Sequence, residues 1–510
     1  MSYLLGLDIG TSGTKSVLFD ETGVPAASFT SEYPMEQPKP GWAEQDPECW
    51  WQAAAESISA VLTQSGIDAG EIAGVGLSGQ MHSLVCLDAD GRVLRKAILW
   101  CDQRTAESAQ ALTDLVGRDT LVSVTANPAM TGFTAAKLLW VRTHEPEIYE
   151  KTRKILLPKD YIRYRLTGEF ATEVSDASGM QLLDVPNRCW SQKLLDILEI
   201  DRSLLADVYE SVAVSGRISP EAARLTGLKA GTPVVGGAGD QAAGGVGNGI
   251  VRTGAVSATI GTSGVVFAHT DRMLLDPQGR VHTLCHAVPG CWHIMGVTQA
   301  AGLSLKWFRE QFCGSEAAVS QRTGEDVYAL LDREAARVPA GCSGLFYLPY
   351  LMGERTPHLD PYARGVFFGL SAMHTRADML RAVMEGVSYS LKDCMEILRK
   401  MGVPVTEVRA SGGGGKSPLW RQMLADMFGK KVTTTNVSEG PALGAAILAG
   451  AGTGVYGSVE EGCDAVLRQK TMQKPDPAAR RIYQARYPIY QSLYRSLKKE
   501  FVRLQQLDEV

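Results

Sequence analysis

The chain has 510 residues, 45% of them hydrophobic and 21% charged, with a formal net charge of −5. This length exceeds the roughly 300 residues that one hydrophobic core can organise, so we expect two large domains, and the composition excludes the disordered and fibrous classes. The weak net charge gives no reason to expect nucleic acid or a membrane surface as a partner, which favours small-molecule ligands.

The first residues carry no basic leader, and Asp8 interrupts their apolar run, so we expect neither a signal peptide nor a membrane span, and a cytoplasmic protein. The ten cysteines include no Cys-x-x-Cys pair, which predicts reduced thiols. Three histidines and two cysteines fall within residues 282–293 without paired zinc-ligand spacing. We expect two strands there, around Pro289 and Gly290.

The pentapeptide Ile-Gly-Thr-Ser-Gly occurs at residues 9–13 and again at 260–264, about half the chain apart. Each copy joins two short β-like runs, which predicts a strand-turn-strand hairpin in each of two similar domains. Turns of Gly, Thr and Ser bring backbone N–H groups and hydroxyls close to phosphate. Asp8 precedes the first copy and Thr259 the second, so only the first can hold a metal cation. Chance recurrence of ordinary turn composition is the alternative.

The first half of the chain is predicted to be an α/β domain. The expected elements are strands at 3–8, 16–19, 72–78 and 85–88, a helix at 47–64 that begins with Asp46 as N-cap, and a helical insertion over 105–200. A glycine-rich run at 232–249 then predicts a domain boundary at Gly249, which divides the chain into domains 1–249 and 250–510.

The second half is predicted to repeat this α/β organisation. The expected elements are a hairpin at 255–269, helices at 300–311, 376–401 and 418–428, and a strand at 407–410. The charged amphipathic segment 477–507 predicts a terminal helix, which we expect to pack back across the interface between the domains.

Asp240 lies in the run 236–245, which is otherwise uncharged and consists mainly of Gly and Ala. A carboxylate among such residues is costly unless it is paired or functional. Asp240 can accept a proton from a substrate hydroxyl, which is the role of the base in phosphoryl transfer to an alcohol. It can also cap a helix that begins at Gln241, and the two roles are compatible.

Four consecutive glycines at 412–415 follow a predicted strand and precede Ser417, the expected N-cap of the next helix. A Walker A loop would need glycine at position 410, which is alanine. Because glycine has no Cβ, a nucleotide can lie against this backbone, and the helix N-terminus favours phosphate. A tight strand-to-helix turn without a ligand is the alternative.

A loop at residues 79–83 joins two predicted strands and places Met81 and His82 at a rim, although Met81 also suits a core. A nearby extended segment presents three alternating side chains on one side, where they suit a sugar: Trp100, Asp102 and Arg104. A solvated ion pair between the last two is the alternative.

The chain resembles the FGGY family of carbohydrate kinases, which have two actin-like ATPase (ribonuclease H-like) α/β domains with an interdomain cleft. Segments 132–144 and 365–385 are similar to the two family signatures. Segments 8–13 and 260–264 are similar to the two phosphate motifs, and segment 412–415 is similar to the adenosine motif. Segments similar to family members that act on D-xylulose are 79–82, 156–161 and 353–358.

The resemblance implies ATP-dependent phosphorylation of D-xylulose at O5, with Asp240 as catalytic base and Asp8 holding Mg²⁺ through water. The candidate sugar contacts are Met81, His82, Asp240, Gln241, Trp100, Asp102 and Arg104. The candidate nucleotide contacts are Gly10, Thr11, Ser12, Gly13, Lys15, Gly261, Thr262, Ser263, Gly412, Gly413, Gly414, Gly415 and Ser417. Gln241 departs from the asparagine that many of these kinases carry after the catalytic aspartate.

Two alternatives stay open. One is a kinase for another ketose or polyol, such as D-ribulose, L-ribulose or glycerol, on the same fold. The other is a non-kinase actin-like ATPase that binds protein, against which the signature segments and Asp240 argue. A homodimer, the commonest assembly of soluble proteins, is compatible with either.

Overall fold

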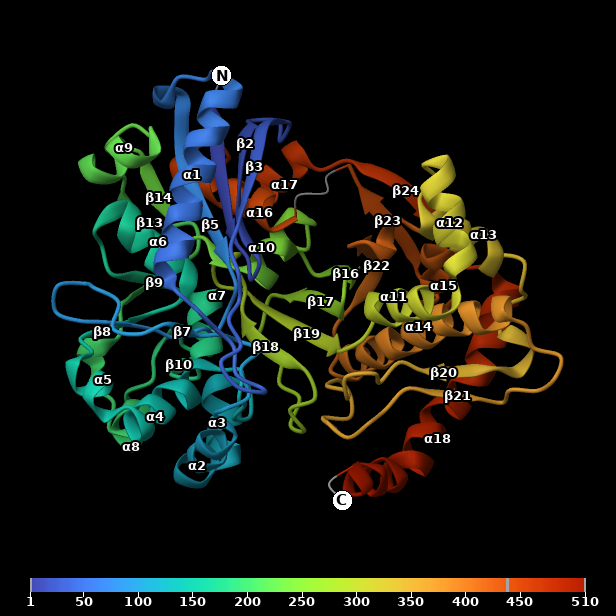
Figure 1. Cartoon of the computed structure of the whole chain (residues 1–510). Coiled ribbons are helices and arrows are strands. Elements are labelled where there is room, and N and C mark those ends of the chain that lie inside the picture. The colour runs from blue at the N-terminus through green and yellow to red at the C-terminus, as the bar shows by residue number, and fades with distance from the viewer. Residues whose placement is uncertain (1, 437–439, 509–510) are drawn as a thin grey trace.

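The computed structural model describes residues 2–436 and 440–508 and contains two lobes, each built on a seven-stranded sheet (Figure 1). The first sheet has the order β13 (Val214–Arg217), β14 (Pro233–Val235), β5 (Ile72–Gly79), β1 (Tyr3–Ile9), β2 (Gly13–Asp20) and β3 (Pro25–Glu32), and β15 (Ala238–Gly239) also pairs with β5. The second has the order β18 (His282–Cys285), β19 (Trp292–Thr298), β17 (Gly264–Thr270), β16 (Gly254–Ile260), β22 (Val405–Ser411), β23 (Lys431–Thr435) and β24 (Gln469–Gln473).

The two sheets repeat one topology. In the first, β1 is antiparallel to β2 and parallel to β5, β2 is antiparallel to β3, and β5 is parallel to β14. In the second, β16 is antiparallel to β17 and parallel to β22, β17 is antiparallel to β19, and β22 is parallel to β23. The prediction of two similar α/β domains, each opening on a hairpin that contains the repeated pentapeptide, is therefore confirmed.

Helices cover both sheets, and a mainly helical insertion extends the first lobe. The first-half helices are α1 (Pro47–Ser65), α2 (Ala106–Val116), α3 (Arg118–Thr125), α4 (Thr134–His144), α5 (Pro146–Lys151), α6 (Pro158–Thr167), α7 (Val174–Ala177), α8 (Gln192–Leu198), α9 (Pro220–Thr226) and α10 (Asp240–Gly247). Short strand pairs join them: β4 (Glu44–Gln45) with β7 (Ala97–Ile98), β6 (Val85–Leu87) with β8 (Lys154–Leu156), β9 (Ala171–Glu173) with β12 (Asp207–Tyr209), and β10 (Leu183–Asp184) with β11 (Cys189–Trp190).

The second-half helices are α11 (Gly302–Phe312), α12 (Gly314–Thr323), α13 (Val327–Ala335), α14 (Arg376–Lys400), α15 (Pro418–Phe428), α16 (Gly440–Thr453), α17 (Val459–Val466) and α18 (Pro477–Asp508), and β20 (Phe346–Leu348) pairs with β21 (Val366–Phe368). No helix in residues 2–436 or 440–508 is long and apolar enough to cross a membrane.

Several helix ends follow from local sequence. The Asp46 side chain accepts a hydrogen bond from the Glu48 N–H at 2.9 Å, and Gly66 ends α1 with a left-handed φ of 65°. Ser417 caps α15 in the same way, as predicted. Helix α11 begins two residues later than expected, because the Gly302 N–H donates to the carbonyl of Gly261 in the second turn.

The terminal helix α18 packs on its own half of the chain, against α15 and β20. Its Tyr483 bonds to Glu385, its Tyr487 to Asp393, and its Tyr494 to Asp360. The element that returns to the first lobe is instead α16, which packs on β1, β5 and α10. Aromatic rings and carboxylates on the second lobe thus give α18 a local partner that a charge pattern alone could not reveal.

Helix α16 lies unusually close to the first sheet because the facing strand positions are glycine. A Cβ added at Gly76 would lie 1.9 Å from the carbonyl oxygen of Ala445, and one at Gly6 would lie 2.0 Å from that of Ala442. Both distances are far inside van der Waals contact, so no side chain fits there. This glycine contact joins the last part of the chain to the first lobe.

The replacement Gly76→Ala should therefore destabilise the protein by roughly 2–4 kcal/mol, because α16 must move away from the sheet. Thermal or urea unfolding would measure the loss. The control is Gly314→Ala, at a helix start where an added Cβ meets nothing within 4 Å. Equal stability of the two variants would contradict the proposed tight contact.

Candidate active site

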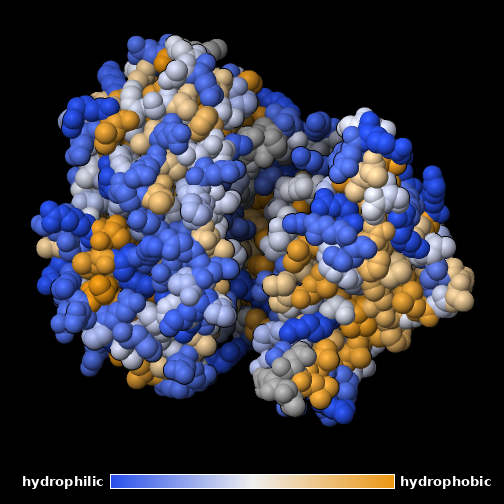
Figure 2. All heavy atoms as spheres, in the orientation of Figure 1, coloured by the Kyte–Doolittle hydropathy of each residue, from blue (hydrophilic) through white to orange (hydrophobic). Residues whose placement is uncertain are grey.

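Three neighbouring strands of the first sheet end side by side and bring predicted site residues together. β1 carries Asp8 to the first turn, β5 ends at Gly79, and β15 leads directly into Asp240 at the start of α10. In register, Gly79 pairs with Ile9 on one side and with Gly239 on the other. α/β proteins bind their ligands at the carboxyl ends of parallel strands. Figure 2 shows a deep groove between the two lobes.

The first glycine-threonine-serine turn is held by side chains that converge from distant segments. Tyr33 Oη donates to the Gly10 carbonyl at 2.7 Å, and Gln80 Nε2 donates to the same oxygen at 3.3 Å. Gln45 Nε2 donates to the Thr11 carbonyl at 2.6 Å. With the carbonyls fixed in this way, the orientation of the turn is set in advance of any ligand.

The two copies of the hairpin differ in charge at matched positions. Asp8 Oδ1 accepts a hydrogen bond from Ser78 Oγ at 2.9 Å, and Lys15 lies opposite Asp8 in the β1–β2 register. In the second sheet the matched pair is Thr259 and Ser411, whose hydroxyl oxygens lie 2.7 Å apart. A hydroxyl therefore replaces the carboxylate, and only the first copy brings a negative charge to its turn.

Asp240 is a partly buried carboxyl at the N-terminus of α10. Burial, and then the negative charge of Asp8, raise the pKa of Asp240 to about 7, while hydrogen bonds from Gln241 act in the opposite direction. The contribution of Asp8 means that the two carboxylates lie near one another. A carboxyl with this pKa can take up and release a proton near neutral pH.

Met81 and His82 lie against the same strand ends. A Cβ at Gly239 would lie 2.8 Å from Met81 Cγ, so Met81 packs beside the residue that precedes Asp240. His82 has a left-handed φ of 68°, and its Nδ1 lies 3.1 Å from the Gly179 carbonyl oxygen. Burial, and then the charge of Lys137, hold the pKa of His82 well below its usual range, so this ring is neutral.

Of the three alternating residues expected to face a sugar, the structure exposes only Trp100. This residue is 42% exposed and its Nε1 donates to Thr11 Oγ1 at 3.1 Å, so it adjoins the first turn. Asp102 and Arg104 are buried and paired at 2.7 Å, with the Arg104 guanidinium 3.6 Å from the Trp42 ring. This differs from both predicted arrangements. The Asp102 carboxylate also accepts a hydrogen bond from the Ala43 N–H, just before β4, and the pair is held inside the protein.

In the second lobe, a cavity of about 570 Å³ lies between α11, α13 and the N-terminus of α15. The second turn supplies Gly261 and Thr262 to its wall, and the glycine run supplies Gly413 and Gly414. A Cβ at Gly413 would meet no atom within 4 Å, so this backbone faces open space. Ser417, also predicted, completes that side of the cavity.

Two other predicted nucleotide residues, Gly412 and Gly415, do not line the cavity. Gly415 is buried, and a Cβ at Gly412 would lie 2.6 Å from the Ile260 carbonyl oxygen, so this glycine is needed for packing. The wall also contains residues that sequence reasoning missed: Lys306, Asp326, Tyr328 and Asp332. They belong to ordinary amphipathic helices or their caps, so no local pattern separates them from surface residues.

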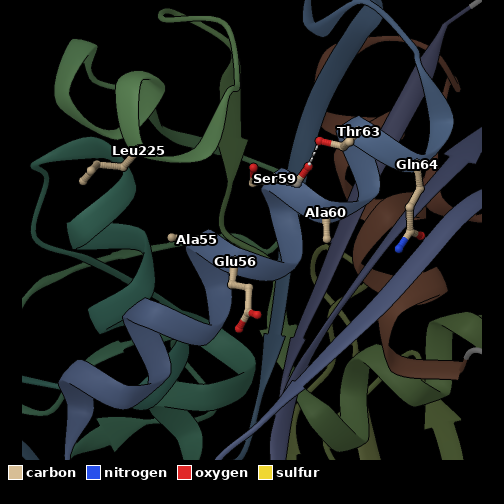
Figure 3. A pocket seen from close by; sticks show the side chains of 7 residues that line it. All are labelled: Ala55, Glu56, Ser59, Ala60, Thr63, Gln64 and Leu225. Carbon is tan, nitrogen blue, oxygen red and sulfur yellow. Dashed lines mark hydrogen bonds between the residues drawn. The ribbon is translucent and has the colours of Figure 1, made fainter.

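A second hollow, of about 550 Å³, lies on the first lobe between α1 and α9 (Figure 3). It is lined mainly by small or polar side chains of one face of α1, together with the exposed Leu225 of α9. Glu56 within it accepts a hydrogen bond from Ser31 at 2.5 Å. None of the predicted site residues contributes to this hollow.

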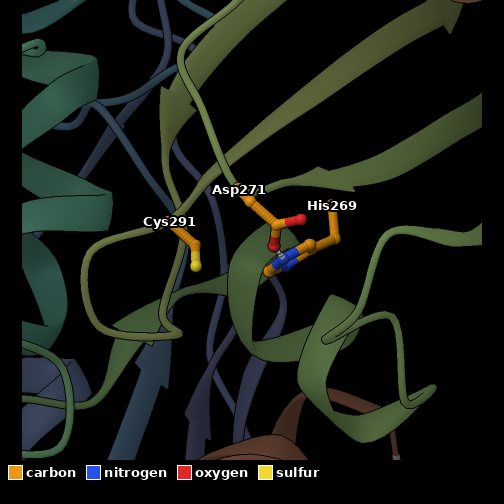
Figure 4. A group of neighbouring side chains, drawn as sticks. All are labelled: His269, Asp271 and Cys291. Carbon is orange, nitrogen blue, oxygen red and sulfur yellow. Dashed lines mark hydrogen bonds and ion pairs between the residues drawn. The ribbon is translucent and has the colours of Figure 1, made fainter. Parts of the chain in front are cut away.

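His269, Asp271 and Cys291 gather where β17 ends and β19 begins (Figure 4). His269 Nε2 lies 2.9 Å from Asp271 Oδ1, and Thr253 donates to Asp271 Oδ2 at 2.6 Å. Both carboxylate oxygens therefore have protein partners without a cation. The strands expected around Pro289 are confirmed as β18 and β19.

The duplicated α/β domains, the paired turns and the carboxylates at the strand ends define a two-domain phosphotransferase of the actin-like ATPase type. The chain belongs to the FGGY family of carbohydrate kinases. The model of the family's N-terminal domain matches residues 3–247, and that of its C-terminal domain matches residues 256–453.

Individual relatives extend over the whole chain. A xylulose kinase of Bacillus subtilis is 39% identical over 98% of this chain and 98% of its own. A solved xylulose kinase from Lactobacillus acidophilus, described as ligand bound, superposes with a TM-score of 0.91 at 30% identity and covers 99% of this chain and 100% of its own. A gluconokinase of Bacillus licheniformis is 32% identical over 99% of this chain and 98% of its own.

Filling the cavity from the glycine run should weaken nucleotide binding. Gly413 has φ −58° and ψ −46°, a backbone that any residue adopts, so Gly413→Leu is expected to fold normally. We expect its dissociation constant for ADP to rise by roughly tenfold or more, measured by calorimetry. The control Gly314→Leu adds the same side chain at another open position and should leave the affinity for ADP unchanged. A similar loss of affinity in both variants would contradict binding of the nucleotide in this cavity.

The raised pKa of Asp240 predicts a stability effect with a definite sign. Between the ordinary aspartate pKa and about 7 the folded state binds a proton that the unfolded state does not, so stability falls as pH rises through this window. Asp240→Asn should therefore stabilise the protein at pH 8, by roughly 1–4 kcal/mol, and have little effect at pH 4. Thermal unfolding at both pH values measures this, with the turn residue Asp20→Asn as the control that should show no gain. A loss of stability at pH 8 would contradict the assigned environment.

Proposed function

We propose that this protein transfers the γ-phosphoryl group of ATP to O5 of D-xylulose, giving D-xylulose 5-phosphate and ADP. The observation that carries the proposal is Asp240, a carboxyl with a pKa of about 7, at the strand ends beside Asp8. The near full-length similarity to xylulose kinases supports this choice of acceptor.

In the proposed mechanism, Asp240 accepts the proton of the sugar hydroxyl as that oxygen attacks the phosphoryl group. The transferring group is metaphosphate-like, so positioning and neutralisation of charge contribute more than the strength of the base. Met81, His82, Gln241 and Trp100 form the proposed sugar site around this carboxyl. The neutral His82 ring suits hydrogen bonding to an uncharged sugar.

Asp8 is the proposed anchor for Mg²⁺. The fit rests on the donor set, since oxygen ligands near the phosphate turn suit a hard cation, and Asp8 Oδ1 already takes a hydrogen bond that orients the carboxylate. When bound, Mg²⁺ supplies charge neutralisation on the phosphates. The chain's own contribution is to hold the Asp8 carboxylate beside the first turn and near Asp240.

The nucleotide is proposed to lie between the lobes, with its base and ribose in the cavity lined by Gly413 and Gly414. The turns at 10–13 and 261–263 hold its phosphates from opposite sides. Each turn offers backbone N–H groups and hydroxyls, and neither brings a bulky side chain. Movement of the two lobes toward one another would exclude water from the transfer.

Gluconate and other polyols or ketoses are the rival acceptors, since a relative of similar identity is named a gluconokinase. The xylulose kinase of Bacillus subtilis is 39% identical to this chain and the gluconokinase of Bacillus licheniformis is 32% identical. The higher similarity favours D-xylulose over gluconate as the acceptor.

The acceptor is tested by measuring ADP release from Mg-ATP with D-xylulose, D-ribulose, L-ribulose, gluconate and glycerol, against a control without sugar. We expect the highest kcat/KM for D-xylulose, and a loss of kcat of roughly 10²-fold or more in Asp240→Ala with little change in ATP affinity. Preference for another acceptor would overturn the substrate but not the reaction. Unchanged kcat in Asp240→Ala would overturn the role of this carboxyl.

A further inference from the structure

A cluster of buried charged side chains lies beneath the strand that leads to Asp240. Its members, whose side chains are at most 1% exposed, are Lys159, Asp160 and Arg163 of α6 and Glu173 and Asp176 at the end of β9 and in α7. None of these groups takes part in the mechanism proposed above, so their role calls for an explanation.

Lys159 is the centre of the cluster. Its Nζ lies 2.7 Å from Asp160, 3.1 Å from Asp176 and 3.3 Å from Glu173. With Arg163 the cluster has two cations and three carboxylates, and burial raises the pKa of Asp176 well above its usual range. Well-packed apolar residues often replace such buried ion clusters without loss of stability, so stability alone does not account for this one.

The cluster is connected to the segment that delivers Asp240. The Gly239 N–H donates to Ser175 Oγ at 3.1 Å, and Ser175 Oγ donates in turn to Glu173 Oε1 at 2.9 Å. Three residues earlier in the chain than Gly239, the carbonyl of Gly236 accepts a hydrogen bond from Arg163. The residues before Asp240 are thus hydrogen-bonded to side chains that are themselves fixed by buried charges.

The same short segment also holds His82. The carbonyl of Gly179, in the middle of the turn Ser178–Met180 that follows α7, lies 3.1 Å from His82 Nδ1. A Cβ at Gly179 would lie 2.3 Å from this ring, so the contact leaves no space. Residues 175–179 therefore contact both sides of the proposed sugar site, the Asp240 side through Ser175 and the His82 side through Gly179.

We propose that Ser175 is a positioning residue that fixes Asp240 relative to the acceptor hydroxyl, through the Gly239 N–H and with the Glu173–Lys159 pair as its support. The inference rests on the proposed role of Asp240 as base. Removal of the Ser175 hydroxyl leaves the Gly239 N–H without this buried partner and frees the strand end to shift. A shift of about 1 Å at a reacting group can cost up to 10²-fold in rate.

The effect should fall mainly on the transfer step, because the Ser175 hydroxyl bonds to Gly239, next to Asp240, and to Glu173, and Ser175 does not line the nucleotide cavity. In Ser175→Ala we expect kcat with D-xylulose to fall roughly tenfold or more, while KM for ATP stays within about twofold. A merely structural role would change stability without separating kcat from the KM for ATP.

The matched control is Ser211→Ala. Ser211 is as buried as Ser175, and its hydroxyl donates to the other oxygen of the same carboxylate, Glu173 Oε2, at 2.7 Å, but this hydroxyl makes no hydrogen bond to Gly239. We expect Ser211→Ala to lower the melting temperature while leaving kcat within about twofold. Should Ser175→Ala fail to fold, Ser175→Cys keeps nearly the same volume with a much weaker hydrogen-bonding group, and the same loss of kcat is expected there.

Three outcomes separate the possibilities. A selective loss of kcat in the Ser175 variants, with Ser211→Ala close to wild type, supports the proposal. Equal kcat losses in the Ser175 and Ser211 variants, or none in either, would overturn it. Asp240→Ala in the same assay distinguishes failure of the Ser175 proposal from failure of the proposed mechanism. Full turnover in Asp240→Ala would mean that Asp240 is not the base, so Ser175 would have no base to position.

Discussion

The arrangement at the strand ends depends on keeping two carboxylates, Asp8 and Asp240, near one another at the ends of parallel strands. Their repulsion and partial dehydration oppose ionisation of Asp240, and the fold must supply the free energy that holds them there. It does so with backbone geometry: β1, β5 and β15 pair in register, and Ser78 binds Asp8 on one side. Much of the surrounding polar network fixes these strand ends and the turn beside them.

The second constraint is the contact of α16 with β1 and β5. Glycines at Gly6 and Gly76 let the helix backbone rest directly on the sheet, so the lobe that carries the carboxylates is completed by residues from the far end of the chain. The boundary between the two halves of the sequence therefore does not coincide with the boundary between the two lobes. A hinge motion would carry α16 with the first lobe while β16 and its neighbours move with the second.

Local patterns predicted much of this structure. The repeated pentapeptide and the capping residues of α1 and α15 are short-range signals, and each element they predicted is present. The helix expected to begin at Gln241 with Asp240 as its cap begins instead at Asp240, with Gly239 as its N-cap. The partners that hold these elements were not predictable, because Tyr33, Gln45 and Ser175 act on segments far away in sequence and carry no local signature. Asp102 was expected to face a sugar because alternation along an extended segment shows which residues share a side. Alternation does not show which other residues cover that side.

The position of α16 has a consequence for the order in which the chain can fold during synthesis. A ribosome that has produced the whole of the first sheet has not yet made the helix that covers one of its faces, since residues 440–453 emerge almost 200 residues after β16 begins. Until then the apolar side chains of β1, β2 and the start of α10 that α16 will bury lack this cover. Nascent chains of this protein should thus need protection from association for most of their translation, although a first domain of ordinary size is complete in sequence by its midpoint.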